Sequence, residues 1–211
     1  MMQIRQATYE DLREIARVHA ICFPKHLSTR IGAGNDCYLL SQFYKEFIND
    51  CPELFVVAVD ESDKVVGFCM GYYLDKAGQQ SKYIHNNRLR VLSRIGWLML
   101  KGDKLAWRKF KMRYRKPQFE ILDHSIDNMP KSDIGDLLSI CMIPEFRGKG
   151  YAQNMIAEFL TRMKAQGRLI CLLSLGVSNA RAKRFYERNG FTLYRKIGST
   201  TITLMKRLQD E

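Results

Sequence analysis

The chain of 211 residues lacks a long apolar run. No uncharged stretch approaches the ~20 residues that a membrane-spanning helix requires. The opening residues, Met1 to Arg5, contain no apolar core of the kind found in secretion signals, so we expect a cytoplasmic protein. Apolar residues still make up 46% of the composition, as in a folded globular protein. This length suits one well-buried domain and is short for two, which predicts a single domain over residues 1–211.

Cysteine pairs at metal-binding spacing are also missing. The six cysteines are scattered and none forms a Cys-x-x-Cys pair: Cys22, Cys37, Cys51, Cys69, Cys141 and Cys171. Most lie in apolar segments, where a free cysteine behaves as a small hydrophobic residue. We therefore expect reduced thiols in the core, no disulfide framework and no metal site. Two common phosphate-binding motifs are absent as well, since the chain has neither a G-x-x-x-x-G-K-[S/T] loop nor a G-x-G-x-x-G fingerprint.

Acidic residues are nearly absent from one segment. Residues 82–117 contain twelve Lys or Arg but a single acid, Asp103. This segment accounts for almost all of the net charge of +12, and the rest of the chain is close to neutral. Aromatic residues, Trp97 and Trp107 among them, lie between the charges. We predict a basic helical insertion at about residues 76–130.

Three interpretations of this insertion stay open. In the favoured one, its apolar residues pack on the domain and its charges are solvated. In the second, the segment contacts an anionic membrane surface or a lipid-linked substrate, because each Lys or Arg near such a surface contributes on the order of 1 kcal/mol and aromatic rings settle among the headgroups. RNA or another polyanion would bind by the same electrostatics and is the least favoured partner. Residue spacing does not separate the three.

Strand-like and helix-like segments alternate along the chain, which predicts an α/β (α+β) domain with a central sheet. Strands are predicted at residues 3–7, 54–59, 65–73, 135–143, 169–175, 191–196 and 200–206, for a sheet of six to seven strands. Helices are predicted from Thr8 to about Cys22, where Thr8 and Asp11 are typical of a capping box, and over residues 37–49. Residues 23–32 are interpreted as a loop. Further helices are expected between the strands at 135–143, 169–175 and 191–196.

A glycine-rich basic turn joins an apolar strand to an amphipathic helix. The strand is closed by Pro144, and the turn reads Arg147-Gly148-Lys149-Gly150-Tyr151-Ala152. Consecutive backbone N–H groups in such a turn can face a pyrophosphate, and the N-terminus of the helix adds partial positive charge. The turn therefore indicates a ligand with a diphosphate, a nucleotide or coenzyme. Taken alone, it also suits an ordinary surface turn.

A second segment lies about thirty residues downstream. There Ser178 or Asn179 can cap a helix that buries Phe185 and Tyr186, and Gly190 can end it in the left-handed conformation. Together, Arg-x-x-Gly-x-Ala and Ser-Asn-x-x-Ala-x-x-Phe-Tyr-x-x-x-Gly-Phe resemble the GNAT superfamily of acetyl-coenzyme A-dependent N-acetyltransferases. The resemblance is strong over residues 135–197 and weaker over residues 2–74. It implies a GNAT fold: a mixed, mostly antiparallel sheet flanked by helices, with the basic insertion between the third and fourth strands.

The resemblance also implies a site for acetyl-CoA as co-substrate. Its pyrophosphate would lie on the turn from Arg147 to Ala152, and its pantetheine arm would pair with strand backbone near Cys141 and Met142. The N–H of Met142 would polarise the thioester carbonyl. Asn179 would contact the arm or serve only as a helix cap. Tyr186 matches the family's tyrosine near the coenzyme sulfur, where a phenol with a pKa of about 10 can donate a proton to the thiolate.

The sequence leaves the general base open. Asp136, at the start of the fourth strand, is the candidate, and its carboxylate is equally compatible with an ordinary strand start. His124, Asp123 or a water chain are alternatives. Some relatives that acetylate protein termini carry a glutamate where this chain has Ser174 and Gly176, which counts against a close match to the ribosomal-protein alanine acetyltransferases.

We therefore predict an enzyme that transfers acetyl from acetyl-CoA to a primary amine by direct attack in a ternary complex. A loose similarity to members of cell-surface polysaccharide pathways favours an amino-sugar on a nucleotide or lipid carrier, whose diphosphate Lys25, Arg30 and the insertion could neutralise. Binding through residues 82–117 would hold the protein at the inner face of the membrane. The alternatives are acetylation of a protein N-terminus or lysine, and a non-catalytic acetyl-CoA-binding module anchored to membrane or RNA. Polyamines are disfavoured by the positive charge.

Overall fold

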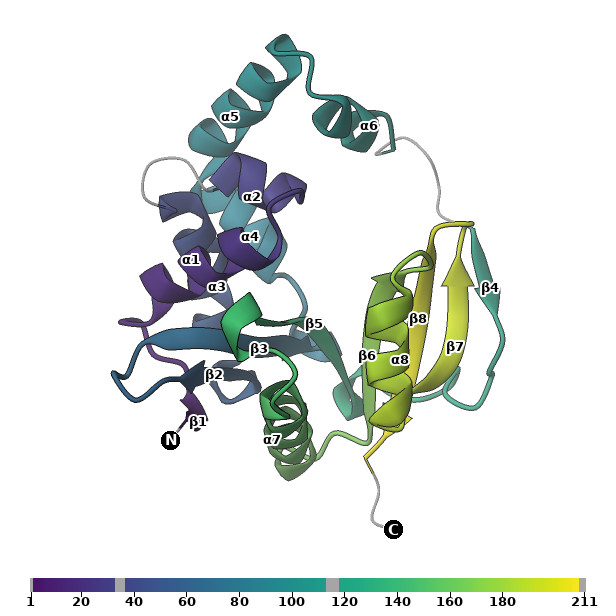
Figure 1. Ribbon diagram of the computed structural model, residues 1–211. Helices are drawn as coiled ribbons and strands as arrows, with labels where there is room; N and C mark the ends of the chain where they lie inside the picture. Colours follow the sequence, from purple (N-terminus) through teal and green to yellow (C-terminus); the bar gives the residue numbers. More distant parts are fainter. Residues whose placement is uncertain (1, 33–36, 113–117, 209–211) are drawn as a thin grey trace.

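The computed structural model describes residues 2–32, 37–112 and 118–208 and has one sheet with helices on both faces (Figure 1). Over these residues the sheet has eight strands in the order β1-β2-β3-β5-β6-β8-β7-β4. The pair β5–β6 is parallel and the other pairs are antiparallel. The strands are β1 Gln3–Gln6, β2 Phe55–Val59, β3 Val65–Tyr73, β4 Phe119–Ile121, β5 Ile134–Met142, β6 Ile170–Gly176, β7 Thr192–Ile197 and β8 Thr201–Arg207. The predicted fold class is confirmed.

Two pairs of helices cover the two faces of the sheet. The helices are α1 Leu12–Cys22, α2 Leu27–Gly32, α3 Tyr38–Asp50, α4 Gln79–Asn86, α5 Arg88–Leu100, α6 Lys104–Met112, α7 Tyr151–Ala165 and α8 Ala180–Arg188. Helices α1 and α3 bury Ile15 and Phe47 against β2 and β3 on one face. Helices α7 and α8 bury Phe159 and Tyr186 on the other face, together with apolar residues of β2, β3, β5, β6 and β8. Alternation of apolar side chains along the strands supplies both cores.

The structure differs from the prediction in three elements. Helix α1 begins at Leu12 and not at Thr8, because the N–H and hydroxyl of Thr8 donate to the Asp11 carboxylate at 2.8 and 3.1 Å and form a turn before the helix. The same carboxylate accepts two bonds from Arg5 at 2.7 and 2.8 Å. Residues 27–32 of the predicted loop form α2, which packs against α3 and α5. Strand β4 adds a further strand to the predicted sheet by pairing with β7.

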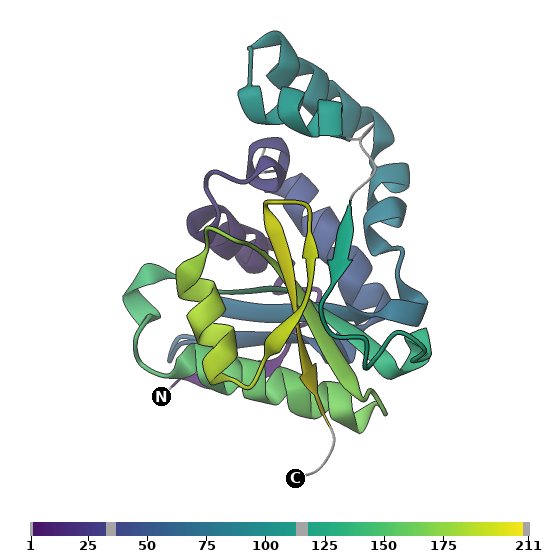
Figure 2. The same cartoon turned by 90° about the vertical axis from the view of Figure 1, so that its right-hand side faces the viewer.

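The insertion between β3 and β5 contains α4, α5, α6 and β4. Its first part packs on the domain, where Tyr83 of α4 and Val91 of α5 are buried with Leu39 of α3. The helices α5 and α6 then extend away from the sheet (Figure 2). None of the described helices combines the length and apolar character needed to cross a membrane.

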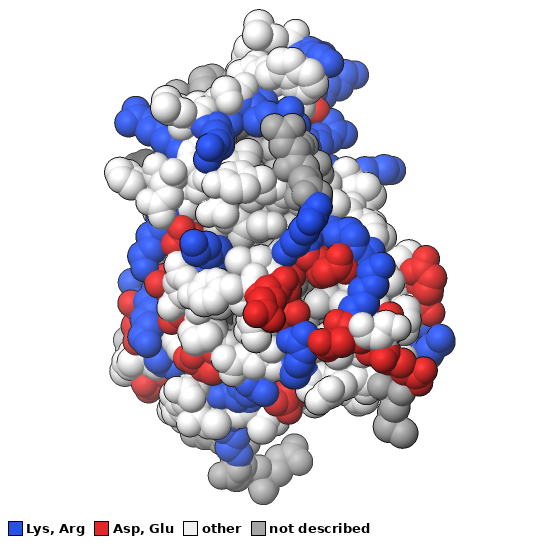
Figure 3. Space-filling model, turned by 90° about the vertical axis from the view of Figure 1, so that its left-hand side faces the viewer, with Lys and Arg blue, Asp and Glu red and all other residues white. Residues whose placement is uncertain are grey.

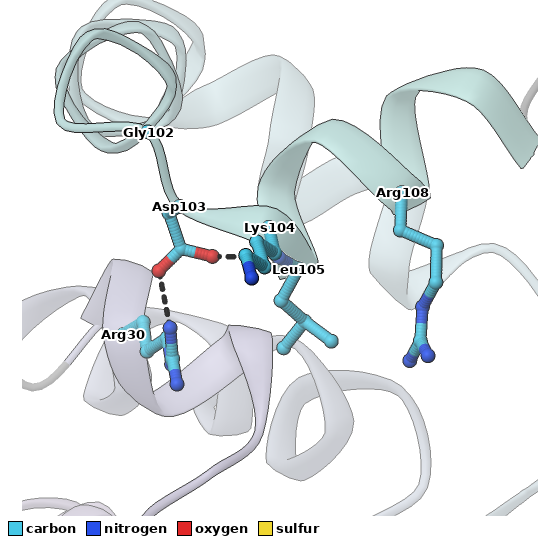
Figure 4. Close-up of a pocket in the computed structure, with 6 residues that line it drawn as sticks. All are labelled: Arg30, Gly102, Asp103, Lys104, Leu105 and Arg108. Carbon is cyan, nitrogen blue, oxygen red and sulfur yellow. Dashed lines mark hydrogen bonds and ion pairs between the residues drawn. The ribbon is translucent and has the colours of Figure 1, made fainter.

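Asp103, the one acid of the basic segment, lies at the start of α6, where both of its carboxylate oxygens are bound. One carboxylate oxygen accepts from the N–H groups of Leu105 and Ala106 at 2.8 and 3.1 Å, which caps the helix. The other forms an ion pair with Arg30 of α2 (Figure 4). The segment therefore joins α2 through its only negative charge, and its other described charges are positive.

Gly71 of β3 provides a test of the packing between the sheet and α7. A Cβ atom there would lie 2.1 Å from the carbonyl oxygen of Asp136 and 2.7 Å from the ring of Phe159. We expect Gly71→Ala to lower the free energy of unfolding by about 1–3 kcal/mol in urea denaturation, because backbone and ring must both shift. Gly96→Ala in α5, where a Cβ meets no atom within 4 Å, should instead be neutral or stabilising by up to about 1 kcal/mol. Equal effects of the two substitutions would contradict this packing.

Candidate functional site

The strands β5 and β6 run side by side for only part of their length. Their parallel ladder ends at the pair Leu137 and Leu173, although β5 continues to Met142 and β6 to Gly176. Beyond the ladder, β5 stays paired with β3 on its far side and β6 with β8. The two strands therefore separate toward their carboxyl ends, at the centre of the sheet.

A β-bulge lies at the point of separation. Gly71 of β3 pairs with Leu137 and Met70 with Ser139, so Leu138 is an extra residue in β5. A bulge bends the strand that contains it, here at the last pair shared with β6. Past the bulge, the edge of β5 that faces β6 presents backbone groups that no described strand binds. An extended ligand can pair with such an edge as an added strand would.

The predicted pyrophosphate turn follows β5 and leads into α7. Gly148 and Gly150 have φ of 79° and 81°, in the left-handed region that favours glycine, and a Cβ at either position would meet no protein atom within 4 Å. Within the described residues, the N–H groups from Gly148 to Ala152 donate to no backbone or side-chain acceptor. The turn is thus open and lined by N–H donors at the positive end of a fifteen-residue helix, which is the chemistry of an anion site.

The side chain of Arg147, the first residue of the turn, binds outside the turn. Its Nε donates to the carbonyl oxygen of Met142 at 2.7 Å, and Nη2 lies 3.7 Å from Sγ of Cys22. The side chain therefore fastens the turn to the end of β5 and to the end of α1. Lys149 is the basic side chain left beside the turn, with Nζ 5.4 Å from the ring centre of Phe146.

Helix α8 lies beside the separated strands on the face that α7 covers. Asn179 caps it, accepting a hydrogen bond from the N–H of Ala182 at 3.2 Å, and Gly190 follows its end with φ of 82°. Both features agree with the predicted helix. Tyr186 is 8% exposed and packs edge-on against Phe191, with ring centres 5.7 Å apart. Burial raises the pKa of its phenol well above the ordinary value, so the hydroxyl stays protonated at neutral pH.

Asp136 lies on the opposite face of the sheet. It is one residue before the last β5–β6 pair and stands between Tyr72 of β3 and Leu172 of β6. Burial raises the pKa of Asp136 to about 7, against a smaller lowering by the charge of Arg195. Burial and the charge of Asp136 together raise the pKa of Tyr72 to about 12. Tyr186 and Asp136 thus border the separation from opposite faces.

A polar group beside Asp136 was not predicted. Arg195 of β7 donates through Nε to the hydroxyl of Thr203 at 3.3 Å, and Thr203 is 3.0 Å from the hydroxyl of Ser174. By strand alternation Ser174 shares its face of β6 with Leu172, the neighbour of Asp136. No sequence pattern indicated Arg195, because its position depends on the order of β6, β8 and β7 in the sheet.

The alternative bases are in the loop after β4. Nδ1 of His124 is 2.7 Å from the carboxylate of Asp127, and the His124 side chain is 72% exposed. Asp123 accepts a bond from the N–H of Ser125 at 2.9 Å, and hydrogen bonds to Ser125 lower its pKa. Both groups are thus bound to neighbours in their own loop. In the described part of the chain no cluster of three His, Cys, Asp or Glu side chains could hold a metal ion.

Comparison with known proteins gives agreement in sequence and in fold. Residues 120–193 match the family model of a GNAT acetyltransferase domain. An uncharacterized N-acetyltransferase of Methanocaldococcus jannaschii is 36% identical over 155 residues, which are 73% of this chain and 60% of that protein, so the chain spans about three fifths of this relative's length. The crystal structure of the PaiA N-acetyltransferase of Thermoplasma acidophilum with coenzyme A has a TM-score of 0.57 at 17% identity, over 98% of this chain and 99% of the other. The structure of YncA of Salmonella typhimurium with acetyl-CoA has a TM-score of 0.57 at 14% identity, over 100% and 96%.

Proposed function

The chain belongs to the GNAT superfamily, and we propose that it is an acetyl-CoA-dependent N-acetyltransferase acting on a primary amine. One observation carries the proposal: the edge of β5 freed by the bulge leads directly into an open turn of N–H donors. An edge that can pair with an amide-containing arm, followed by an anion site, suits a ligand built of both parts. Coenzyme A has such an arm and a diphosphate.

The residues present fit this coenzyme. The open space at Gly148 and Gly150 leaves room for phosphate oxygens beside the N–H groups from Gly148 to Ala152. The backbone at Cys141 and Met142 would pair with the arm, and Asn179, the cap of α8, follows the end of β6 on the other side of the gap. When bound, the coenzyme supplies the acetyl thioester.

We assign the proton transfers to two side chains on opposite faces of the sheet. The phenol of Tyr186, kept protonated by burial, would give its proton to the sulfur as the thioester bond breaks. The carboxylate of Asp136, with a pKa near 7, would take a proton from the attacking amine at neutral pH. The geometry supports direct attack, since an acceptor approaching from the Asp136 face meets the gap opposite Tyr186.

Turnover with a panel of amines tests the function. Full-length protein is incubated with acetyl-CoA and amino-sugar nucleotides, peptides with free N-termini, lysine peptides or diamines, and thiol release is followed beside calorimetric binding of acetyl-CoA. We expect binding in every case and release with one acceptor class. Binding without release would favour the non-catalytic module, and absence of binding would reject the proposal.

Replacing the proposed acid tests its role. We expect Tyr186→Phe to lower kcat by about 100-fold while the Kd of acetyl-CoA changes less than about threefold, because only the proton donor is lost. Tyr194→Phe is the matched control, since Tyr194 is also a buried tyrosine but packs on the other face with Ile134 and Met205. Equal kcat values for Tyr186→Phe and the unmodified protein would remove Tyr186 from the mechanism.

The pH dependence of the rate tests the proposed base. Asp136 is protonated below its pKa of about 7 and cannot accept a proton there, so kcat/KM of the unmodified protein should fall as the pH drops below 7. Asp136→Asn should be slower by about 100-fold and lose this acidic limb. Asp133→Asn, three residues earlier, should keep both rate and limb. A limb that persists in Asp136→Asn would point to the water chain or His124.

For the acceptor we propose an amine that carries an anionic group, and specifically an amino-sugar on a nucleotide or lipid carrier. The positive charge of the Arg195 guanidinium lowers the pKa of Asp136. Among the described residues, however, this guanidinium forms no ion pair. Such a group can hold a carboxylate or phosphate while the amine meets the base. A second cationic site is the pocket lined by Arg30, Lys104 and Arg108, in which Asp103 pairs with Arg30 (Figure 4).

We further propose that the outer part of the insertion contacts an anionic membrane surface, as a lipid carrier would require. Leu89, Leu92 and Leu100 of α5 are 83%, 53% and 90% exposed and share one side of the helix. Trp97 lies beside them, with Nζ of Lys101 3.8 Å from its ring centre. Figure 3 shows Lys and Arg with almost no Asp or Glu over this part, whereas the opposite end carries both signs. Exposed leucines with an aromatic and basic rim are typical of interfacial helices.

Vesicle sedimentation tests this surface. Binding to vesicles of phosphatidylglycerol and phosphatidylcholine should exceed binding to phosphatidylcholine alone and weaken with salt. We expect Leu89→Ser with Leu100→Ser to reduce the affinity by about tenfold or more, through loss of apolar contact with the bilayer. Leu122→Ser, at a leucine that is 44% exposed outside α5, is the control and should have no effect. Equal binding to both kinds of vesicle would reject the proposal.

A further inference from the structure

Two cysteines from different parts of the chain meet beside the predicted coenzyme site. Cys22 is the last residue of α1, and Cys141 is in the separated part of β5. Both side chains pack against the core cluster under α1 and α3, where α1 contacts β5. Each is half-buried, whereas Cys51, Cys69 and Cys171 are buried. None of the six cysteines, all of them among the described residues, forms a disulfide.

The surroundings make the two thiols unequal. The hydrogen bond from Cys141 and the guanidinium of Arg147, 3.7 Å away, lower the pKa of Cys22 to about 7, against the effects of burial and of Glu145. Burial and the neighbouring Cys22 raise the pKa of Cys141. The other titratable group facing the pair is Tyr44 of α3. A thiolate that is partly exposed beside an arginine is nucleophilic near neutral pH, and a second thiol in contact can resolve its mixed disulfide.

We propose that Cys22 and Cys141 form a thiol modification site that reacts with small disulfides and closes into an intramolecular disulfide. The Cys22 thiolate attacks one sulfur of the small disulfide, whose S–S bond breaks and releases one thiol that takes a proton from solvent. The Cys141 thiol loses its proton to solvent and attacks Sγ of Cys22, and the second small thiol leaves. Two protein thiols are oxidised, and one small disulfide is reduced to two thiols.

The disulfide would act on coenzyme binding, a consequence that rests on the proposed function. Its sulfurs would lie about 2 Å apart, and the covalent link would fix the end of α1 to the edge of β5. That edge is the one proposed to pair with the pantetheine arm. The oxidised Cys22 would also lose the thiolate that Arg147 contacts, and Arg147 fastens the turn to β5.

Thiol mapping tests the pair without any activity measurement. Full-length reduced protein is incubated with oxidised glutathione, alkylated in denaturant, and analysed by intact mass and peptide mapping. We expect two of the six thiols to be lost, a cross-linked peptide joining Cys22 to Cys141, and full reversal by dithiothreitol. In Cys141→Ser a glutathione adduct should persist on Cys22. In Cys22→Ser no glutathione adduct should form on Cys141 at a comparable rate. Cys37→Ser, at another half-buried cysteine, should behave as the unmodified protein.

Alkylation of all six thiols after treatment, or a cross-link at another pair, would overturn the proposal. Calorimetry with acetyl-CoA then tests the consequence: oxidation should raise its Kd at least tenfold, dithiothreitol should restore it, and Cys22→Ser should be insensitive to the oxidant. An unchanged Kd in cross-linked protein would overturn control of the coenzyme site. If reduced protein does not bind acetyl-CoA, the proposed function fails, while the thiol map still decides the pair.

Discussion

The separation of β5 from β6 is the constraint on which the candidate site depends. In a sheet, an interior strand normally forms backbone hydrogen bonds along both of its edges. Here the facing edges of β5 and β6 pair with no described strand over their final residues. The close packing of α7 holds the paired end in place. Phe159 and Met163 lie against Gly71 and Gly135, where a Cβ would come within 2.7 and 2.5 Å of their side chains. Because that end is fixed, the extra residue at Leu138 bends only the far end of β5.

The same packing explains why the two sides of the site have different chemistry. The face under α7 and α8 is an apolar core, in which a phenol keeps its proton. The opposite face near Asp136 is covered partly by the loop before β5 and holds the hydroxyls of Ser174 and Thr203 and the guanidinium of Arg195. A carboxylate and a phenol are thus kept in different environments on the two faces of one sheet.

Local chemistry was readable from the sequence, and long-range contacts were not. Gly190 adopts the predicted left-handed conformation and Asn179 caps α8, because each depends on a few neighbouring residues. The mixed, mostly antiparallel sheet followed from the resemblance to a known family. By contrast, Arg195 near Asp136 and Cys22 against Cys141 depend on packing between distant segments. Helix α2 and strand β4 were missed for a related reason, since α3 and α5 stabilise one and β7 pairs with the other.

The placement of the insertion has a consequence for how such a chain can change. Tyr73, where β3 ends, pairs with Gly135 near the start of β5, so a short turn could join the two strands. The entropy of closing a loop grows only slowly, by about 0.6 kcal/mol for each doubling of its length. An antiparallel connection can therefore lengthen into a set of helices with little cost to the sheet. Variation at this one join could give relatives different surfaces beside the same central strands.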